Sequence, residues 1–217
     1  HELKTPLTTL QGYVDTLIDG AVADPDVNMK YLQRSSFTIE RMITMVEDLE
    51  TITKLEQNTD PLHITKFDFI TLVKEVIDIM ELKANTRNIQ MIIQNHTSAP
   101  LYVLADKEKI RQVLINLIDN SIKYGRQSGK TFIKIYYFEQ NLLIEIEDNG
   151  IGIDEGHLQR IFERFYRVDK SRSREVGGTG LGLAIVKHII EAHDQHINVR
   201  SKVGVGTTFT FTLPLAN

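Results

Sequence analysis

A histidine at the start of the sequence is the side chain best suited to act as a nucleophile. His1 opens the segment His-Glu-Leu-Lys-Thr-Pro-Leu. A neutral imidazole is nucleophilic near pH 7, and a carboxylate can orient its second ring nitrogen. Thr5 follows one helical turn later and would share a helical face with His1. The segment predicts a covalent acceptor, against the plainer alternative of an exposed terminal histidine without a role.

Three polar side chains further along are spaced to share a second helical face. Asn116, Asn120 and Lys123 are separated by four and three residues, which places them together on a helix. Amide oxygens suit Mg²⁺, a hard cation that keeps several waters and binds substrate phosphates. The lysine is a point charge for phosphate. Taken alone, the pattern fits a solvated polar face equally well.

The segment Asp-Asn-Gly-Ile-Gly at 148–152 follows a predicted strand directly. Gly150 and Gly152 permit a tight turn that brings the backbone close to a ligand. A buried Asp148 could accept a hydrogen bond from the exocyclic amine of adenine. The alternative is a plain turn, because Asn-Gly is a common hairpin signal.

The string Gly-Gly-Thr-Gly-Leu-Gly-Leu at 177–183 opens a predicted helix. Free backbone N–H groups at a helix N-terminus form an anion site, here suited to phosphates. The string lacks the P-loop spacing and the βαβ unit of a dinucleotide site. The expected ligand contacts are Gly178, Thr179, Gly180, Leu181 and Gly182.

Two further segments complete the predicted nucleotide site. Aromatic and basic residues from Phe162 to Arg167, followed by a polar, basic run to Glu175, predict a mobile lid. The segment 204–209 predicts a turn into the last strand, with Thr207 as a second adenine contact.

Apolar spacing predicts the elements that hold these residues. Leu3, Leu7, Leu10, Val14 and Leu17 form the stripe of a bundle helix over residues 1–20. A break at 20–25 and a second stripe, at Leu32, Ile39, Met42, Val46, Leu49 and Ile52, make a helical hairpin. One hairpin alone cannot fully bury its two apolar stripes, so we expect two copies to form a dimeric four-helix bundle. The alternative is a monomeric hairpin lying on the second domain.

Beyond a linker at 59–65, strands and helices intermix, which predicts an α+β chain whose residues 66–217 form an α/β sandwich. We expect helices at 69–82, 107–124 and 181–192, and strands at 89–94, 101–104, 131–138, 142–147, 197–201 and 207–213. Residues 1–58 are then the dimerisation and phosphotransfer hairpin. A loose group, His188, His193 and His196, matches no zinc motif, and we expect it at a solvated helix end.

The motifs in this order resemble the sensor histidine kinases of two-component signalling, over nearly the whole chain. Residues 116–207 resemble the ATP-binding fold shared by histidine kinases, DNA gyrase, mismatch-repair ATPases and heat-shock chaperone ATPases. The resemblance implies that Asn120 holds Mg²⁺ and Asp148 recognises the adenine of ATP. It implies that Asn116, Lys123 and the loop at 178–182 contact phosphates. Tyr124 would lie near the base, Arg164 near the phosphate tail, and Phe162 would help to pin the lid.

The resemblance also indicates where the phosphoryl group goes. Family members that hydrolyse ATP carry a glutamate one turn before the Mg²⁺-binding asparagine, whereas this chain has Asn116 there. An amide cannot activate water, so the site predicts transfer to His1, with Glu2 as the orienting acid/base. Thr5 would align water when the partner, a response regulator, is dephosphorylated. An ATP-driven conformational clamp and a nucleotide-binding scaffold without activity are the alternatives.

Composition excludes other classes. The net charge of −4 over 217 residues gives no general attraction to nucleic acid or an anionic membrane, so neither partner is expected. Zero cysteines exclude disulfides and thiolate metal sites. No apolar run approaches the roughly 18 residues of a membrane span. Because the chain lacks an initiator Met, we expect an excised cytoplasmic portion of a membrane-anchored sensor kinase.

Overall fold

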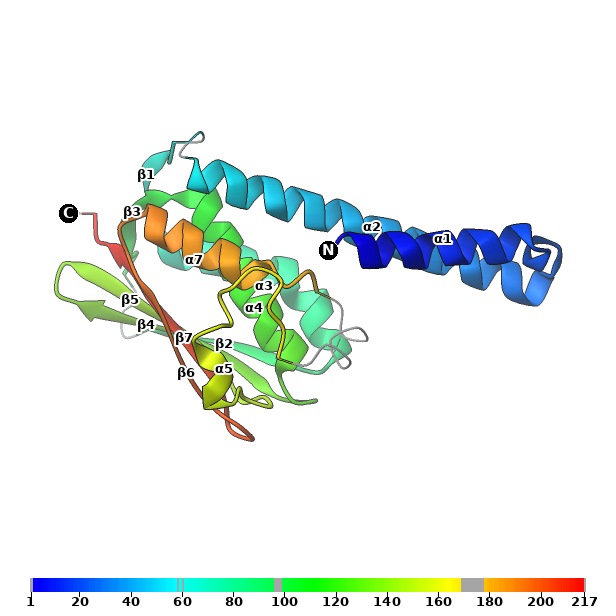
Figure 1. The fold of residues 1–217 in the computed structure, drawn as a ribbon. Helices are drawn as coiled ribbons and strands as arrows, with labels where there is room; N and C mark the ends of the chain where they lie inside the picture. The colour runs from blue at the N-terminus through cyan, green and yellow to red at the C-terminus, as the bar shows by residue number, and fades with distance from the viewer. Residues whose placement is uncertain (1, 58, 60, 96–98, 169–177, 217) are drawn as a thin grey trace.

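The computed structural model describes residues 2–57, 59, 61–95, 99–168 and 178–216. Two helices form an arm at the N-terminal end, α1 (Lys4–Ile18) and α2 (Pro25–Glu56), joined by the short 3-10 helix η1 (Ala21–Ala23). Figure 1 shows α1 and the first part of α2 projecting beyond the rest of the molecule, while the second part of α2 runs over α7. The predicted helical hairpin is confirmed.

The turn of the hairpin lies at the predicted break. Gly20 has a φ of +121°, a conformation that side chains disfavour. Asp24 then caps α2, because its carboxylate accepts a hydrogen bond from the Asp26 N–H at 2.9 Å. Pro25 occupies the first helical position, where its missing N–H costs nothing.

The remaining chain forms a mixed sheet covered by helices. The five-stranded sheet has the order β2 (Gln90–Asn95), β4 (Lys130–Phe138), β5 (Asn141–Asp148), β7 (Gly206–Pro214), β6 (Ile197–Lys202). The β2–β4 pair is parallel and the other pairs are antiparallel. A separate antiparallel pair joins β1 (Ile64–Asp68) to β3 (Tyr102–Asp106).

Three helices cover one face of the sheet, α3 (Phe69–Thr86), α4 (Lys107–Tyr124) and α7 (Gly182–Ala192) (Figure 1). Along β5 every second residue is buried, so Leu142, Ile144 and Ile146 point into the layer between sheet and helices. The alternation of apolar and polar residues in the sequence therefore matches the buried face of β5, because successive side chains of a strand point to opposite faces of the sheet. The predicted α/β sandwich is confirmed.

The end of α2 belongs to this same core. Ile52 and Leu55 are buried within the hydrophobic cluster that the sheet and its helices form. Ile52 was expected on the stripe that a second hairpin would cover, but it packs inside the chain's own core. In α1 and the first part of α2, by contrast, Leu7, Leu32 and Ile39 are exposed.

Two short elements were not predicted. β1 includes residues 64 and 65, which the sequence analysis assigned to a linker, and its exposed side chains lack a clear alternation. The helix α5 (Glu155–Leu158) spans a single turn, too short for a periodic signal. In the described part of the chain, no helix is both long and apolar enough to cross a membrane.

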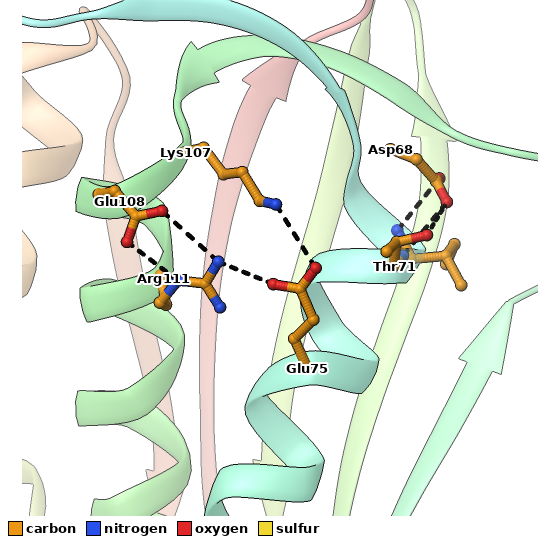
Figure 2. Close-up of polar contacts among 7 residues, drawn as sticks. Asp68, Thr71, Glu75, Lys107, Glu108 and Arg111 are labelled. Atoms are coloured by element: carbon orange, nitrogen blue, oxygen red, sulfur yellow. Dashed lines mark hydrogen bonds and ion pairs between the residues drawn. The ribbon is translucent and has the colours of Figure 1, made fainter.

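Ion pairs tie α3 to α4. Glu75 of α3 contacts the ammonium of Lys107 at 3.4 Å and the guanidinium of Arg111 at 2.7 Å (Figure 2). Asp68 caps α3 by accepting hydrogen bonds from the N–H groups of Ile70 and Thr71. Because Arg111 donates to Glu75, the pKa of Glu75 lies below its ordinary value.

His193 is not at a solvated helix end, and that expectation was wrong. The residue is 8% exposed, and its Nε2 accepts a hydrogen bond from the Asp106 N–H at 3.0 Å. Nδ1 lies 2.7 Å from the Ile189 carbonyl oxygen, so it carries the proton. Asp106 caps α4, so His193 joins the end of α7 to the start of α4. Among the described residues, no His, Cys, Asp or Glu cluster could hold a metal ion.

A buried pair of hydroxyls links α4 to the sheet, and it generates the first prediction. Ser121 and Thr131, 3% and 0% exposed, hydrogen-bond to each other. Ser121→Ala should destabilise the fold by about 1–3 kcal/mol, because Thr131 would keep a buried hydroxyl without a partner. The double variant with Thr131→Val should cost less than the sum of the single changes, measured by urea unfolding. Strictly additive costs would contradict the pairing.

Candidate functional site

An open pocket of about 650 Å³ lies where α4, the loop before α7, the ends of β5 and β7, and α2 meet. Most of the side chains and loop residues predicted to contact a nucleotide line it. These are Asn116, Asn120, Lys123, Tyr124, Asp148, Gly152, Gly178, Thr179, Gly180, Gly182 and Thr207. Four separate segments of the chain therefore meet in one cavity, although their individual roles stay predictions.

The helix α4 presents its polar face to the pocket. Its opposite face buries Ile110, Leu114 and Leu117 against the core, so Asn116, Asn120 and Lys123 are left facing the cavity. The ammonium of Lys123 is held 2.6 Å from the carboxylate of Asp119. Asp119 also lines the pocket, although no role was predicted for it.

Asp148 is the most perturbed acid of the site. It is the last inward-facing residue of β5 and pairs in register with Thr207 of β7, so both line the pocket from the sheet. Asp148 is 9% exposed, and its Oδ1 accepts the Gly150 N–H at 2.8 Å. Burial raises the pKa of Asp148 to about 6, although the Gly150 and Thr207 N–H groups oppose the shift. A buried acceptor at this position suits an amine donor of a bound base.

Close backbone contacts explain why glycine is needed at both positions after Asp148, Gly150 and Gly152. A Cβ on Gly150 would lie 2.3 Å from the Tyr124 carbonyl oxygen, so only glycine lets this turn meet the end of α4. Gly152 has a φ of +70° and contacts the β6–β7 turn equally closely. Gly152 lines the pocket, whereas Gly150 does not line it and packs against the end of α4.

The loop before α7 faces the polar side of α4. Gly178, Thr179, Gly180 and Gly182 line the pocket. Leu181 is fully buried instead and anchors the loop in the core. Because α7 begins at Gly182, its first N–H groups lie at the cavity wall, where a helix favours an anion.

Phe162 and Arg164 do not line the pocket. Phe162 packs edge-on against Phe209, with ring centroids 6.3 Å apart. Arg164 forms an ion pair with Glu56 at the end of α2. Arg167 does line the pocket, and the basic run at 169–175 lies outside the described residues. The expected place of Arg164 near a phosphate tail therefore has no support in this arrangement.

The helix α2 contributes a wall of the pocket that was not predicted. Arg41, Thr44 and Asp48 line the pocket. Their spacing of three and four residues puts them on one helical face, which was readable from the sequence. Only the tertiary arrangement shows that this face meets the loop before α7.

The predicted acceptor segment lies apart from the pocket in the described residues. His1 falls outside the described residues. Glu2 and Thr5 are exposed, and no described residue of α1 lines the pocket. The described part of the acceptor segment, from Glu2 onward, therefore does not contribute to the pocket.

Comparison with protein-family models finds matches to two separate parts of the chain. Residues 105–217 match the histidine kinase-, DNA gyrase B- and HSP90-like ATPase family, which is more than half of the chain. Residues 1–58 match the His Kinase A (phospho-acceptor) domain.

Among curated proteins, the chain is 40% identical to the sensor histidine kinase WalK of Bacillus subtilis over 216 residues. It is 38% identical to the sensor protein kinase WalK of Staphylococcus aureus, again over 216 residues. These matches cover 99% of this chain but 35% and 51% of the two relatives. The chain therefore spans a third to a half of the curated relatives it matches.

Solved structures of histidine kinases share the fold. The histidine kinase AdeS of Acinetobacter baumannii superposes with a TM-score of 0.82 at 33% identity, covering all of this chain and 98% of that one. ThkA, solved in complex with the response regulator protein TrrA, gives a TM-score of 0.79 at 25% identity. That match covers all of this chain and 59% of the ThkA chain.

The buried charge of Asp148 generates the second prediction. Since its pKa rises from 3.8 to about 6 on folding, the native state binds more protons than the unfolded state between these values. Stability is therefore lost as pH rises through this window. Asp148→Asn should raise the free energy of unfolding at pH 7.5 by up to roughly 2–3 kcal/mol.

That gain should shrink as the pH falls from 6 to 4, measured by urea unfolding across the range. Asp154→Asn, at an exposed helix cap, is the control and should show no such gain. A benefit of Asp148→Asn that is independent of pH would contradict the assignment.

Proposed function

The chain belongs to the family of histidine kinase-, DNA gyrase B- and HSP90-like ATPases, and on that premise we propose that it is an ATP-dependent protein-histidine kinase. It phosphorylates His1 and passes the phosphoryl group to an aspartate of a response regulator. The match of residues 1–58 to a phospho-acceptor domain carries this proposal, because it supplies a phosphate acceptor in the same chain as the nucleotide pocket.

The reaction uses the nucleotide pocket as the donor site. A ring nitrogen of His1 attacks the γ-phosphorus of ATP, and the bond from that phosphorus to the β–γ bridging oxygen breaks. ADP leaves with the electron pair, and the imidazole gives up one proton. Glu2 orients the second ring nitrogen and takes part in this proton transfer.

The pocket supports ATP as the donor. Asp148 offers a buried acceptor for the amine of adenine, and the loop before α7 offers backbone N–H groups to phosphates. Lys123 adds a cation at the same end, since its Nζ lies 3.8 Å from where a Cβ of Gly178 would be. Thr207 lies opposite Asp148 as a second contact to the base.

Asn120 is the proposed Mg²⁺ ligand. Its amide oxygen is a hard donor in a pocket whose described walls lack a cluster of three metal-binding acids or histidines. This fits Mg²⁺, which takes few protein ligands and binds largely through waters and phosphates. When bound, it would neutralise part of the phosphate charge.

Water is a poor acceptor here. Asn116 lines the pocket. By the family resemblance it stands where members that hydrolyse ATP carry a glutamate, and an amide cannot take a proton from water at neutral pH. The acid one turn along, Asp119, is held by Lys83 and Lys123. The site therefore retains ATP until the imidazole arrives.

The arm supports a homodimer. Leu7, Val14, Leu32, Ile39 and Val46 are exposed on the hairpin, and a second copy would cover them as a four-helix bundle. We assign residues 1–58 to this hairpin, 59–63 to a linker, and the chain from β1 at residue 64 onward to the catalytic part. Thr5 would align water for dephosphorylation of the regulator. The chain would be the cytoplasmic kinase portion of a longer, membrane-anchored sensor.

The third prediction tests the acceptor. His1→Gln should abolish the phosphorylated adduct, which is acid-labile and base-stable, because an amide cannot replace the nucleophilic nitrogen. Labelling with Mg-ATP measures it, and calorimetry should show ATP affinity near that of the parent chain. His196→Gln, at an exposed histidine, is the matched control and should label normally. A labelled His1→Gln protein would refute the assignment.

The fourth prediction tests the metal ligand. Asn120→Asp should weaken Mg-ATP binding on the order of tenfold, about 1.4 kcal/mol, because a carboxylate repels the phosphates. Asn198→Asp, on the exposed strand β6, adds the same charge away from the pocket and should leave affinity unchanged. Equal Kd values for Asn120→Asp and the parent chain in calorimetry would show that Asn120 does not contact Mg-ATP.

A further inference from the structure

The helix α2 holds the loop before α7 through two side chains that the proposed reaction does not use. Asp48 Oδ2 accepts a hydrogen bond from the Thr179 hydroxyl at 2.8 Å. Arg41 Nη2 donates to the Gly178 carbonyl oxygen at 3.0 Å. Asp48 and Arg41 lie seven residues apart, two turns along one face of α2. The arm is therefore fastened to the part of the pocket that receives phosphates.

Asp48 interacts with two groups that are also proposed to bind phosphates, the Thr179 hydroxyl and the Lys123 ammonium. Its hydrogen bond takes the hydroxyl of Thr179, a predicted phosphate contact. Burial raises the pKa of Asp48, with Glu47 adding to the rise, while the Thr179 hydrogen bond and the charge of Lys123 lower it. Asp48 thus lies within electrostatic reach of Lys123, the pocket's proposed phosphate cation. Asp119 faces the same ammonium at 2.6 Å.

A carboxylate and a phosphate tail cannot both occupy this place without a cost. Both are anionic, and both require the same hydroxyl and the same cation. Like charges a few ångströms apart in a partly desolvated site repel each other. Binding of a triphosphate therefore favours departure of Asp48, and docking of Asp48 opposes the triphosphate.

We propose that Asp48 is an intramolecular competitor for the phosphate tail, so that docking of α2 on the loop before α7 and binding of ATP oppose each other. This inference rests on the proposed ATP site. Asp48 sets the affinity for the charged part of the nucleotide and leaves recognition of the base untouched. Since α2 belongs to the hairpin that carries His1, arrival of ATP would release the acceptor arm from its docked position.

The test separates charge from base recognition. Asp48→Asn keeps the shape and an acceptor for Thr179 but removes the charge. Glu47→Gln is the matched control, because Glu47 is exposed on the neighbouring position of α2. Binding of Mg-ATP and of adenosine to each 217-residue chain is measured by calorimetry. Asp48→Asn should bind Mg-ATP about three- to tenfold more tightly, with adenosine affinity unchanged, and Glu47→Gln should match the parent chain.

The outcomes are distinct. Unchanged or weaker ATP binding by Asp48→Asn, or an equal gain for adenosine, would overturn the competition and leave the ATP site standing. Absence of binding of both ligands to the parent chain would overturn the ATP site itself, and this inference with it.

A distance measurement tests the release of α2 directly. The sequence has no cysteine, so spin labels at Glu40→Cys on α2 and Glu155→Cys on α5 are unique. Both positions are exposed. Mg-ATP should shift the distance between the labels, whereas adenosine should not, and Asp48→Asn should show the shifted distance without nucleotide. A distance that Mg-ATP leaves unchanged would overturn the proposal.

Discussion

The amphipathic helix α4 is the constraint on which the rest of the structure depends. One face must bury Ile110, Leu114 and Leu117 against the sheet, which fixes the rotation of the helix about its axis. Asn116, Asn120 and Lys123 then face the pocket by geometry alone. Both ends of the helix are also held, at Asp106 by the ring of His193 and near Tyr124 by the turn through Gly150. Hydrophobic packing thus sets the position of the polar side chains.

Asp148 places an ionisable carboxylate at a buried position, where an apolar side chain would stabilise the fold more. Asp148 continues the inward-facing series Leu142, Ile144 and Ile146, so its strand position alone would suit an apolar residue. A carboxylate there has a raised pKa and accepts hydrogen bonds from the backbone N–H groups of Gly150 and Thr207. Such a group weakens the fold at neutral pH, as is common where stability and ligand recognition compete.

Much of this arrangement could be predicted from the sequence, because periodic patterns report buried faces. The alternation of β4 and β5 and the stripe of α4 identified their inward residues. The sequence could not show that His193 is buried, because that depends on the contact between α7 and the cap of α4. Nor could it show that Arg41 and Asp48 enter the pocket, since their polar face looks like any solvated one. The burial of Ile52 in the chain's own core could not be predicted either, because an apolar stripe does not specify which partner covers it.

Because the end of α2 is buried in the core, that end is fixed, and the hairpin turn at the other end of the helix can be displaced like the tip of a lever. Withdrawing Ile52 and Leu55 from the core would expose two apolar side chains, at about 1.5–3 kcal/mol each. Glu56 adds contacts to Arg164 and His188 at the same end. The 32 residues of α2 span about 48 Å, so a tilt of about 10° around this fixed end displaces the hairpin turn by about 8 Å. Small rearrangements near the pocket are thereby magnified at the far tip of the arm.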